Sequence, residues 1–119
     1  MSENVIAVDV EADSLHHYRE KLCLIQIATP TACLIIDPLA DVDIALLKPL
    51  FLAPDITKIV HGASYDVRCL DMCCGIQIHN LFDTEIACRF LGIGESGLNA
   101  VVQQTFQVTL DKKYQKKDW

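Results

Sequence analysis

Residues 5–11 read Val-Ile-Ala-Val-Asp-Val-Glu, an apolar run that ends in two carboxylates. The β-branched residues predict a buried strand. Asp9 and Glu11 are two positions apart, so on a strand they point to the same face, about 6.6 Å apart along the backbone. Two ionised groups at that distance repel by about 3 kcal/mol at an effective dielectric of roughly 20. Either a hard divalent cation such as Mg²⁺ or Mn²⁺ lies between them, or the strand runs out into water with both acids hydrated.

Composition limits the classes of protein to consider. The chain has 119 residues, 51% of them hydrophobic, which suits one small domain with a substantial core. The net charge of −6 argues against loose electrostatic binding to nucleic acid, although residues 112–117 are either a local basic patch or a solvated tail. The sequence shows neither a signal-peptide layout at its start nor an apolar stretch long enough to span a bilayer. We therefore expect a cytoplasmic protein with no membrane partner, and the sequence leaves the oligomeric state open.

The cysteines raise a separate alternative. Cys69 and Cys73 have the i, i+4 spacing of a helix, Cys74 follows directly, and His79 is near in sequence, which together bring zinc into consideration. The second ligand pair of a structural zinc site is not visible in the sequence. Reduced, mostly buried thiols are therefore the expectation for the six cysteines.

Hydrophobic patterning predicts three strands joined by short links, followed by strands that alternate with helices. This order is typical of an antiparallel meander that continues into parallel strands, in a mixed sheet covered by helices. The predicted strands are residues 5–11, 21–28, 32–36, 57–62 and 76–82, and the predicted helices are residues 43–52, 65–74, 84–91 and 98–106.

Helix boundaries are indicated by residues with known preferences. Ser64, Asp83 and Ser96 are predicted N-caps, because their side chains can accept hydrogen bonds from the first free N–H groups of a helix. Gly75 and Gly92 are predicted to end the helices that precede them.

A third acid falls where a site is expected. Asp66 is in the first turn of a helix that follows a predicted strand, and Tyr65 precedes it. In open sheets of this kind, strand ends and helix starts gather at one edge, where binding sites are built. If the strand at residues 5–11 is central, Asp66 approaches Asp9 and Glu11. Taken alone, Asp66 is better explained as a favourable acid at a helix N-terminus.

Four segments together resemble a known family. They are Asp9-Val10-Glu11, the strand at residues 22–28 (Leu-Cys-Leu-Ile-Gln-Ile-Ala), residues 60–66 (Val-His-Gly-Ala-Ser-Tyr-Asp) and residues 81–87 (Leu-Phe-Asp-Thr-Glu-Ile-Ala). In this order, over essentially the whole chain, they resemble the DEDD superfamily of 3′–5′ exonucleases, specifically the ribonuclease D-like branch. The resemblance implies an α/β, ribonuclease H-like fold with a mixed five-stranded sheet flanked by helices. Its first three strands would be antiparallel and its fourth and fifth parallel.

The family has a fourth carboxylate, in a Tyr-x-x-x-Asp or His-x-x-x-x-Asp motif on a late helix. Residues 114–118 do spell Tyr-x-x-x-Asp, with Tyr114 and Asp118 in place. The surrounding lysines and Asp118-Trp119 are more similar to the segment that precedes this motif in the family. On this basis we expect residues 1–119 to be a single, incomplete 3′–5′ exonuclease domain, truncated at its C-terminus.

The resemblance also implies a mechanism and a partner. Asp9, Glu11 and Asp66 would be the catalytic and metal-binding residues, holding two divalent cations, Mg²⁺ or Mn²⁺. The substrate would be a nucleic acid with a free 3′ end, single-stranded RNA rather than DNA. Tyr65 and Leu15 are candidate substrate contacts; Leu15 is either a wedge against the terminal base or a loop residue packed on the core. Without a fourth carboxylate, we expect weak or no activity from this chain alone.

Two other classes of function stay open. One is a catalytically inactive module of the same fold that binds nucleic acid or protein. The other is a cysteine-rich structural or redox protein, which would contain zinc or disulfides.

Overall fold

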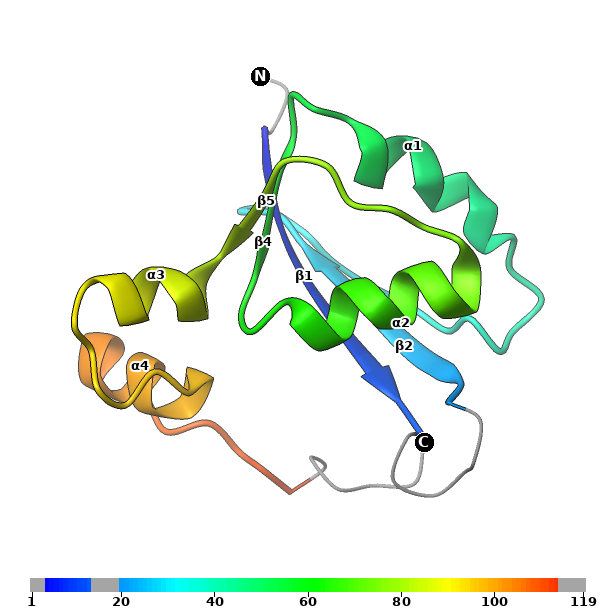
Figure 1. The fold of residues 1–119 in the computed structure, drawn as a ribbon. Helices are drawn as coiled ribbons and strands as arrows, with labels where there is room; N and C mark the ends of the chain where they lie inside the picture. The colour runs from blue at the N-terminus through cyan, green and yellow to red at the C-terminus, as the bar shows by residue number, and fades with distance from the viewer. Residues whose placement is uncertain (1–3, 14–19, 114–119) are drawn as a thin grey trace.

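A computed structural model describes residues 4–13 and 20–113 (Figure 1). They include one five-stranded sheet with the strand order β3-β2-β1-β4-β5. The β1–β2 and β2–β3 pairs are antiparallel, and the β1–β4 and β4–β5 pairs are parallel. The α/β fold predicted from the sequence is therefore confirmed, with the strand at residues 5–11 in the centre. The strands are β1 (Val5–Ala12), β2 (Leu22–Ala28), β3 (Cys33–Ile36), β4 (Thr57–Val60) and β5 (Leu81–Asp83).

The helices follow the predicted order, except that one predicted helix is divided into two. The predicted helix at residues 43–52 is a short 3₁₀ helix, η1, followed by α1, and Pro49 lies in the first turn of α1. Proline fits there because the first N–H groups of a helix have no partner inside it, so Pro49 lies at the start of a helix rather than bending one. None of the described helices is both long and apolar enough to cross a membrane. The helices are η1 (Ile44–Leu47), α1 (Lys48–Leu52), α2 (Ser64–Cys74), α3 (Thr84–Phe90) and α4 (Leu98–Phe106).

The core lies on one face of the sheet. Ile6, Val8 and Val10 of β1 point into it, and Phe51 of α1 and Leu70 of α2 cover them with no exposed surface of their own. Figure 1 shows α1 and α2 together beside the sheet, with α3 and α4 set apart from them. The alternate residues of β1 point to the opposite face, which is more open to water. One face of β1 is therefore buried in the core, and the other face, which carries Asp9 and Glu11, is accessible to solvent.

Two of the predicted helix caps are wrong. Ser64 is the first residue of α2, and the cap position belongs to Ala63, which has no side chain to accept a bond. Ser96 does not cap α4, which starts after Gly97. The hydroxyl of Ser96 is directed to Glu85 instead. At Ser96 a tertiary contact therefore replaces the local cap that the sequence suggested.

The other predicted boundaries are confirmed. Gly75 ends α2 in the left-handed conformation, with φ of 60°, and Gly92 follows α3 with φ of 76°. Asp83 caps α3 through bonds from the backbone N–H groups of Glu85 and Ile86.

The last strand is shorter than expected. Residues 76–82 were predicted to form it, but β5 begins only at Leu81. Ile76 is fully buried in the core, and the backbone N–H of His79 donates to the carbonyl of Phe51 in α1. The segment therefore packs under α1 before it can pair with β4.

Candidate active site

The first two acids lie on the half of β1 that extends past its neighbour β4. The β1–β4 register pairs Val5 with Thr57 and ends with Ala7 opposite Ile59. Asp9 and Glu11 follow that point, on the open face of the sheet. The end of β4 leaves space beside them, and the chain turns there into α2. A difference in strand length thus makes the recess in which the site is built.

The third acid comes from the first turn of α2. Asp66 is only 7% exposed, and its Oδ2 has no hydrogen-bond partner among the described residues. A buried carboxylate oxygen without a donor is costly, by about 1–3 kcal/mol or more for a charged group. Such an atom in a native fold is explained by a bound water, a bound ion or a functional role of the group.

Electrostatics link the three acids. The pKa of Asp66 rises from 3.8 to about 7, chiefly because its carboxyl is buried. The negative charges of Asp9 and Glu11 contribute to this rise. Loss of hydration also raises the pKa of Asp9, and it raises that of Glu11 together with the charge of Asp9. Asp9 and Glu11 are therefore near enough to Asp66 to oppose its ionisation.

The donor set suits a divalent cation, but the carboxyls do not enclose one. Among the residues that the structure describes, no three His, Cys, Asp or Glu side chains are gathered closely enough to hold a metal ion. Oxygen-only ligands are those that Mg²⁺ and Mn²⁺ prefer. Like charges separate when no cation lies between them. The oxygen ligands and the unpartnered oxygen of Asp66 are compatible with a cation site, although the described carboxyls are not gathered around one point.

Asp83 holds the turn that presents Asp66. Its carboxylate accepts bonds from the backbone N–H groups of Gly62 and Ala63, at 3.0 and 2.8 Å, before α2. The same carboxylate caps α3. Burial favours the neutral acid, but these backbone bonds together outweigh it and hold the pKa of Asp83 below its usual value. The sequence identified Asp83 as a helix cap, and its second role needs the β4–β5 pairing.

Gln26 is a residue of the site that the sequence did not single out. It lies directly opposite Asp9 in the β1–β2 register, and its Nε2 donates to Asp9 Oδ2 at 3.2 Å. In the sequence, Gln26 is marked only by its place in residues 22–28, one of the segments that resemble the family. Its contact with Asp9 depends on the register of the two strands, which the sequence alone does not give.

His61 ties the segment before α4 to the end of β4. A carbonyl oxygen can only accept, so Nε2 of His61 donates to the backbone oxygen of Ser96 at 2.8 Å. Nδ1 lies 2.9 Å from the hydroxyl oxygen of Thr84, the first residue of α3. His61 thereby fixes the start of α4 relative to the sheet.

Two hollows open beside the acids. One of about 740 Å³ is lined by Glu11, and one of about 350 Å³ is lined by Asp9. Gln26 and Leu98 line both, so the hollows adjoin under α4. Glu11 and Asp9 are thus each reached from one of these hollows, whereas Asp66 lines neither.

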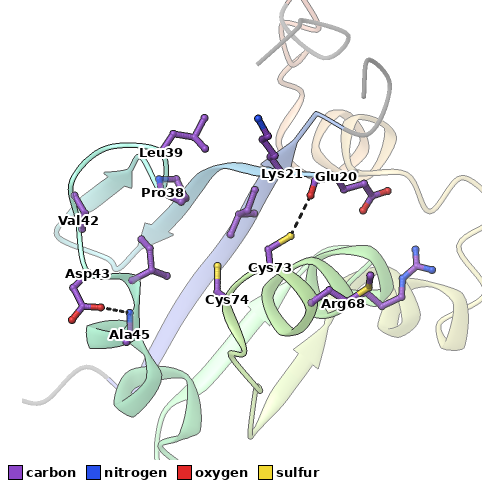
Figure 2. Close-up of a pocket in the computed structure, with 13 residues that line it drawn as sticks. Glu20, Lys21, Pro38, Leu39, Val42, Asp43, Ala45, Arg68, Cys73 and Cys74 are labelled. Atoms are coloured by element: carbon purple, nitrogen blue, oxygen red, sulfur yellow. Dashed lines mark hydrogen bonds between the residues drawn. The ribbon is translucent and has the colours of Figure 1, made fainter. Parts of the chain in front are cut away.

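A larger groove, of about 860 Å³, lies elsewhere. It is bounded by residues 38–45, the start of β2 and the side of α2 that carries Arg68 and Cys73 (Figure 2). The thiol of Cys73 is 3.8 Å from the backbone oxygen of Glu20 there. The lining includes none of the three acids, so size alone does not locate the site.

The remaining candidate residues have different outcomes. Leu15, Tyr114 and Asp118 lie outside the described residues. Tyr65 packs against the core, with the guanidinium of Arg68 6.0 Å from its ring centre. A direct contact of Tyr65 with substrate stays a prediction.

A ribonuclease H-like sheet that gathers carboxylates at the end of its first strand defines a class of metal-dependent nucleases. Comparison with known proteins specifies the family. The family model described as 3'-5' exonuclease matches residues 1–119. The chain belongs to this 3′–5′ exonuclease family, as the sequence motifs indicated.

Named relatives agree with this assignment. The exosome complex component 10 homolog of Caenorhabditis elegans is 38% identical over 114 residues, which are 95% of this chain and 13% of that protein. Ribonuclease D of Xanthomonas oryzae pv. oryzae is 36% identical over 115 residues, 96% of this chain and 32% of that one. The chain thus spans a third or less of these relatives.

Solved structures share the fold. The catalytic core of RRP6 from Trypanosoma brucei has a TM-score of 0.92 and 43% identity, covering 98% of this chain and 33% of that one. Brucella melitensis NrnC, solved with bound Mg²⁺, has a TM-score of 0.82 at 24% identity, over 99% of this chain and 59% of that one. At that identity NrnC supports the fold alone.

Proposed function

We propose that this chain carries the metal-binding acids of a 3′–5′ exoribonuclease that hydrolyses phosphodiester bonds at the 3′ ends of RNA. The observation that carries the proposal is the buried Oδ2 of Asp66, which has no hydrogen-bond partner among the described residues and feels the charges of Asp9 and Glu11. That arrangement is unfavourable for a structural acid and favourable for a cation ligand.

Each acid has a proposed role. Asp9 would be the ligand shared by the two cations, as the family resemblance implies. Glu11, on the same strand, would complete the site that holds the attacking water, and Asp66, on α2, would orient the other cation. Two divalent cations, Mg²⁺ or Mn²⁺, supply water activation and stabilisation of the leaving 3′ oxygen when bound.

The proposed substrate is single-stranded RNA with a free 3′ end. Among the described residues that line the two hollows, the acids are Asp9, Glu11, Glu95 and Asp111, and the lysine is Lys112. A polyanion approaching this surface meets like charge, so binding of the phosphate should depend on divalent cations rather than on basic side chains. RNA is preferred over DNA in this proposal because the named relatives include ribonuclease D and exosome components.

The first test is cation binding, followed by cleavage. We expect the purified chain to bind Mn²⁺ in calorimetry, and Asp9→Asn or Asp66→Asn to remove that binding. Degradation of a 5′-labelled oligoribonucleotide by the chain alone should be weak or absent, since the trio offers only three carboxylates. Any degradation should proceed from the 3′ end and stop in Asp9→Asn. Mn²⁺ binding that is unchanged in Asp9→Asn or in Asp66→Asn would overturn the proposal.

A catalytically inactive binding module is the second candidate, because the described carboxyls do not enclose an ion. It predicts binding of single-stranded oligonucleotides that is the same in EDTA and in Mn²⁺. The third alternative, a structural or redox protein, receives no such support. All six cysteines are free thiols.

Cytoplasmic localisation is likewise a proposal. Fractionation of cells that express a tagged chain would test it, and recovery in another compartment would refute it.

A further inference from the structure

We infer that Gln26 is a positioning residue for the cation site: its neutral amide orients Asp9 while adding no charge to the acid trio. This inference rests on the proposed function, because it assumes that Asp9 binds a cation. It assigns a task to a residue outside the trio.

The sheet fixes the contact in space. Asp9 and Gln26 face each other across the antiparallel β1–β2 pair, in the centre of the sheet. Gln26 Nε2 donates to Asp9 Oδ2 at 3.2 Å. The amide bond thus fixes one of the two carboxylate oxygens, and the backbone N–H of Val10 also donates to the carboxyl. Because β1 and β2 pair along Ala7–Ala12, neither backbone can shift without breaking the register.

The chemistry of the donor matters as much as its place. A lysine opposite Asp9 would donate a stronger hydrogen bond, but its positive charge would compete with the cation for the carboxylate. An apolar side chain would leave the backbone N–H of Val10 as a donor to the carboxylate but remove the donor on the β2 side. An amide donates without charge, so it orients Asp9 and preserves the full negative charge of the trio. Partners of metal ligands commonly act in this way, and replacing them typically weakens metal affinity about 10–100-fold.

The position of Gln26 in the hollows is consistent with this role. It lines both the hollow with Glu11 and the hollow with Asp9. Gln26 therefore lies where the two hollows adjoin, next to the Asp9 carboxylate that it orients. It is only partly buried, so its replacement should leave the core intact.

The test measures Mn²⁺ affinity by calorimetry and the melting temperature in EDTA on the same samples. Gln26→Met, similar in length but without a donor, should weaken Mn²⁺ binding about tenfold with an unchanged melting temperature. Gln26→Asn keeps the polarity but is shorter by one methylene, and it should show a similar loss. Gln26→Lys should lose more affinity than Gln26→Met because it adds charge. Gln77→Met, at an exposed position that lines neither hollow, is the control and should match the wild type.

The outcomes separate the two proposals. If Asp9→Asn binds Mn²⁺ as the wild type does, the proposed function fails. If Asp9→Asn abolishes binding while Gln26→Met and Gln26→Asn bind normally, the function stands and the role of Gln26 is refuted. If the affinity of Gln26→Met falls only together with its melting temperature in EDTA, Gln26 is a structural residue and the inference is also refuted. Wild-type affinity in Gln26→Lys would overturn the requirement for a neutral donor.

Discussion

Replacing Asp66 by asparagine should stabilise the cation-free protein at neutral and alkaline pH. The carboxyl has a pKa of about 7 in the folded chain against 3.8 unfolded. Between these values the folded state keeps a proton that the unfolded state has released, so the free energy of unfolding falls as the pH rises through this window. At 1.36 kcal/mol per pKa unit, full ionisation of Asp66 would destabilise the fold by about 4 kcal/mol.

The measurable effect is smaller. Asp9 and Glu11 are partly open to water, and salt screens their charges, so we expect about 2 kcal/mol at pH 8. For a chain of this size, that gain raises the melting temperature of Asp66→Asn by about 5–10 °C over wild type in EDTA. At pH 4 both side chains are neutral, and the two proteins should melt within about 2 °C of each other.

Added cation should reverse the order. A ligand that binds only the folded state at 100 times its dissociation constant stabilises by about 2.7 kcal/mol. Mn²⁺ should therefore raise the melting temperature of the wild type at pH 8 and leave Asp66→Asn unchanged. Differential scanning fluorimetry at pH 4 and 8, with EDTA or Mn²⁺, measures all four conditions.

Asp71→Asn is the matched control, since Asp71 is an exposed acid on the same helix. It should follow the wild type in every condition. The reasoning is refuted if Asp66→Asn is less stable than wild type at pH 8 in EDTA, or if its advantage is the same at pH 4.

Three further predictions concern stability, measured by urea unfolding. Asp83→Ala should lose about 2 kcal/mol or more, because several backbone N–H groups lose their acceptor, whereas Asp43→Ala, which uncaps only the exposed η1, should lose about 1 kcal/mol or less. Equal losses would refute the double role of Asp83. Gly62→Ala should lose more stability than Gly92→Ala. Both glycines have positive φ, but an added Cβ at Gly62 would lie 2.9 Å from Oε2 of Glu85, whereas at Gly92 it would meet open space. The same cost at both glycines would contradict this. Lys58 is fully buried with a lowered pKa, so between that pKa and 10.5 the folded state binds fewer protons than the unfolded state and gains stability as the pH rises. The free energy of unfolding of Lys58→Met, relative to that of the wild type, should therefore be higher at pH 6 than at pH 9.5. A difference between the two proteins that does not change with pH would contradict this prediction.

Much of the fold follows from local patterns. The alternation in residues 5–11 predicts a strand with one buried face, and the structure buries Ile6, Val8 and Val10 on that face. The motif order predicted the mixed sheet and the placing of Asp66 near the end of the first strand. These features depend on strand and helix periods, which a short stretch of sequence contains.

The features that escaped prediction are set by distant contacts. The start of β5 depends on Ile76 entering the core under α1. The pairing of Gln26 with Asp9 depends on the β1–β2 register, and a shift by one residue would turn Gln26 to the other face. Neither choice is visible in the residues nearby, because each is decided by what packs from another part of the chain.

Asp66 and Asp83 show how structure separates residues that sequence treats alike. Both are acids at the start of a helix, where the helix dipole favours negative charge. Asp83 accepts hydrogen bonds from backbone N–H groups of two segments. These bonds hold its pKa below the usual value, so Asp83 is an ionised acid with a structural role. Asp66 has an oxygen without a partner among the described residues and a pKa of about 7. Environments that push the pKa values of similar groups apart commonly distinguish functional acids from structural ones. If this separation is correct, the two losses have opposite signatures: removing Asp83 weakens the fold, whereas removing Asp66 strengthens the cation-free fold and eliminates its response to Mn²⁺.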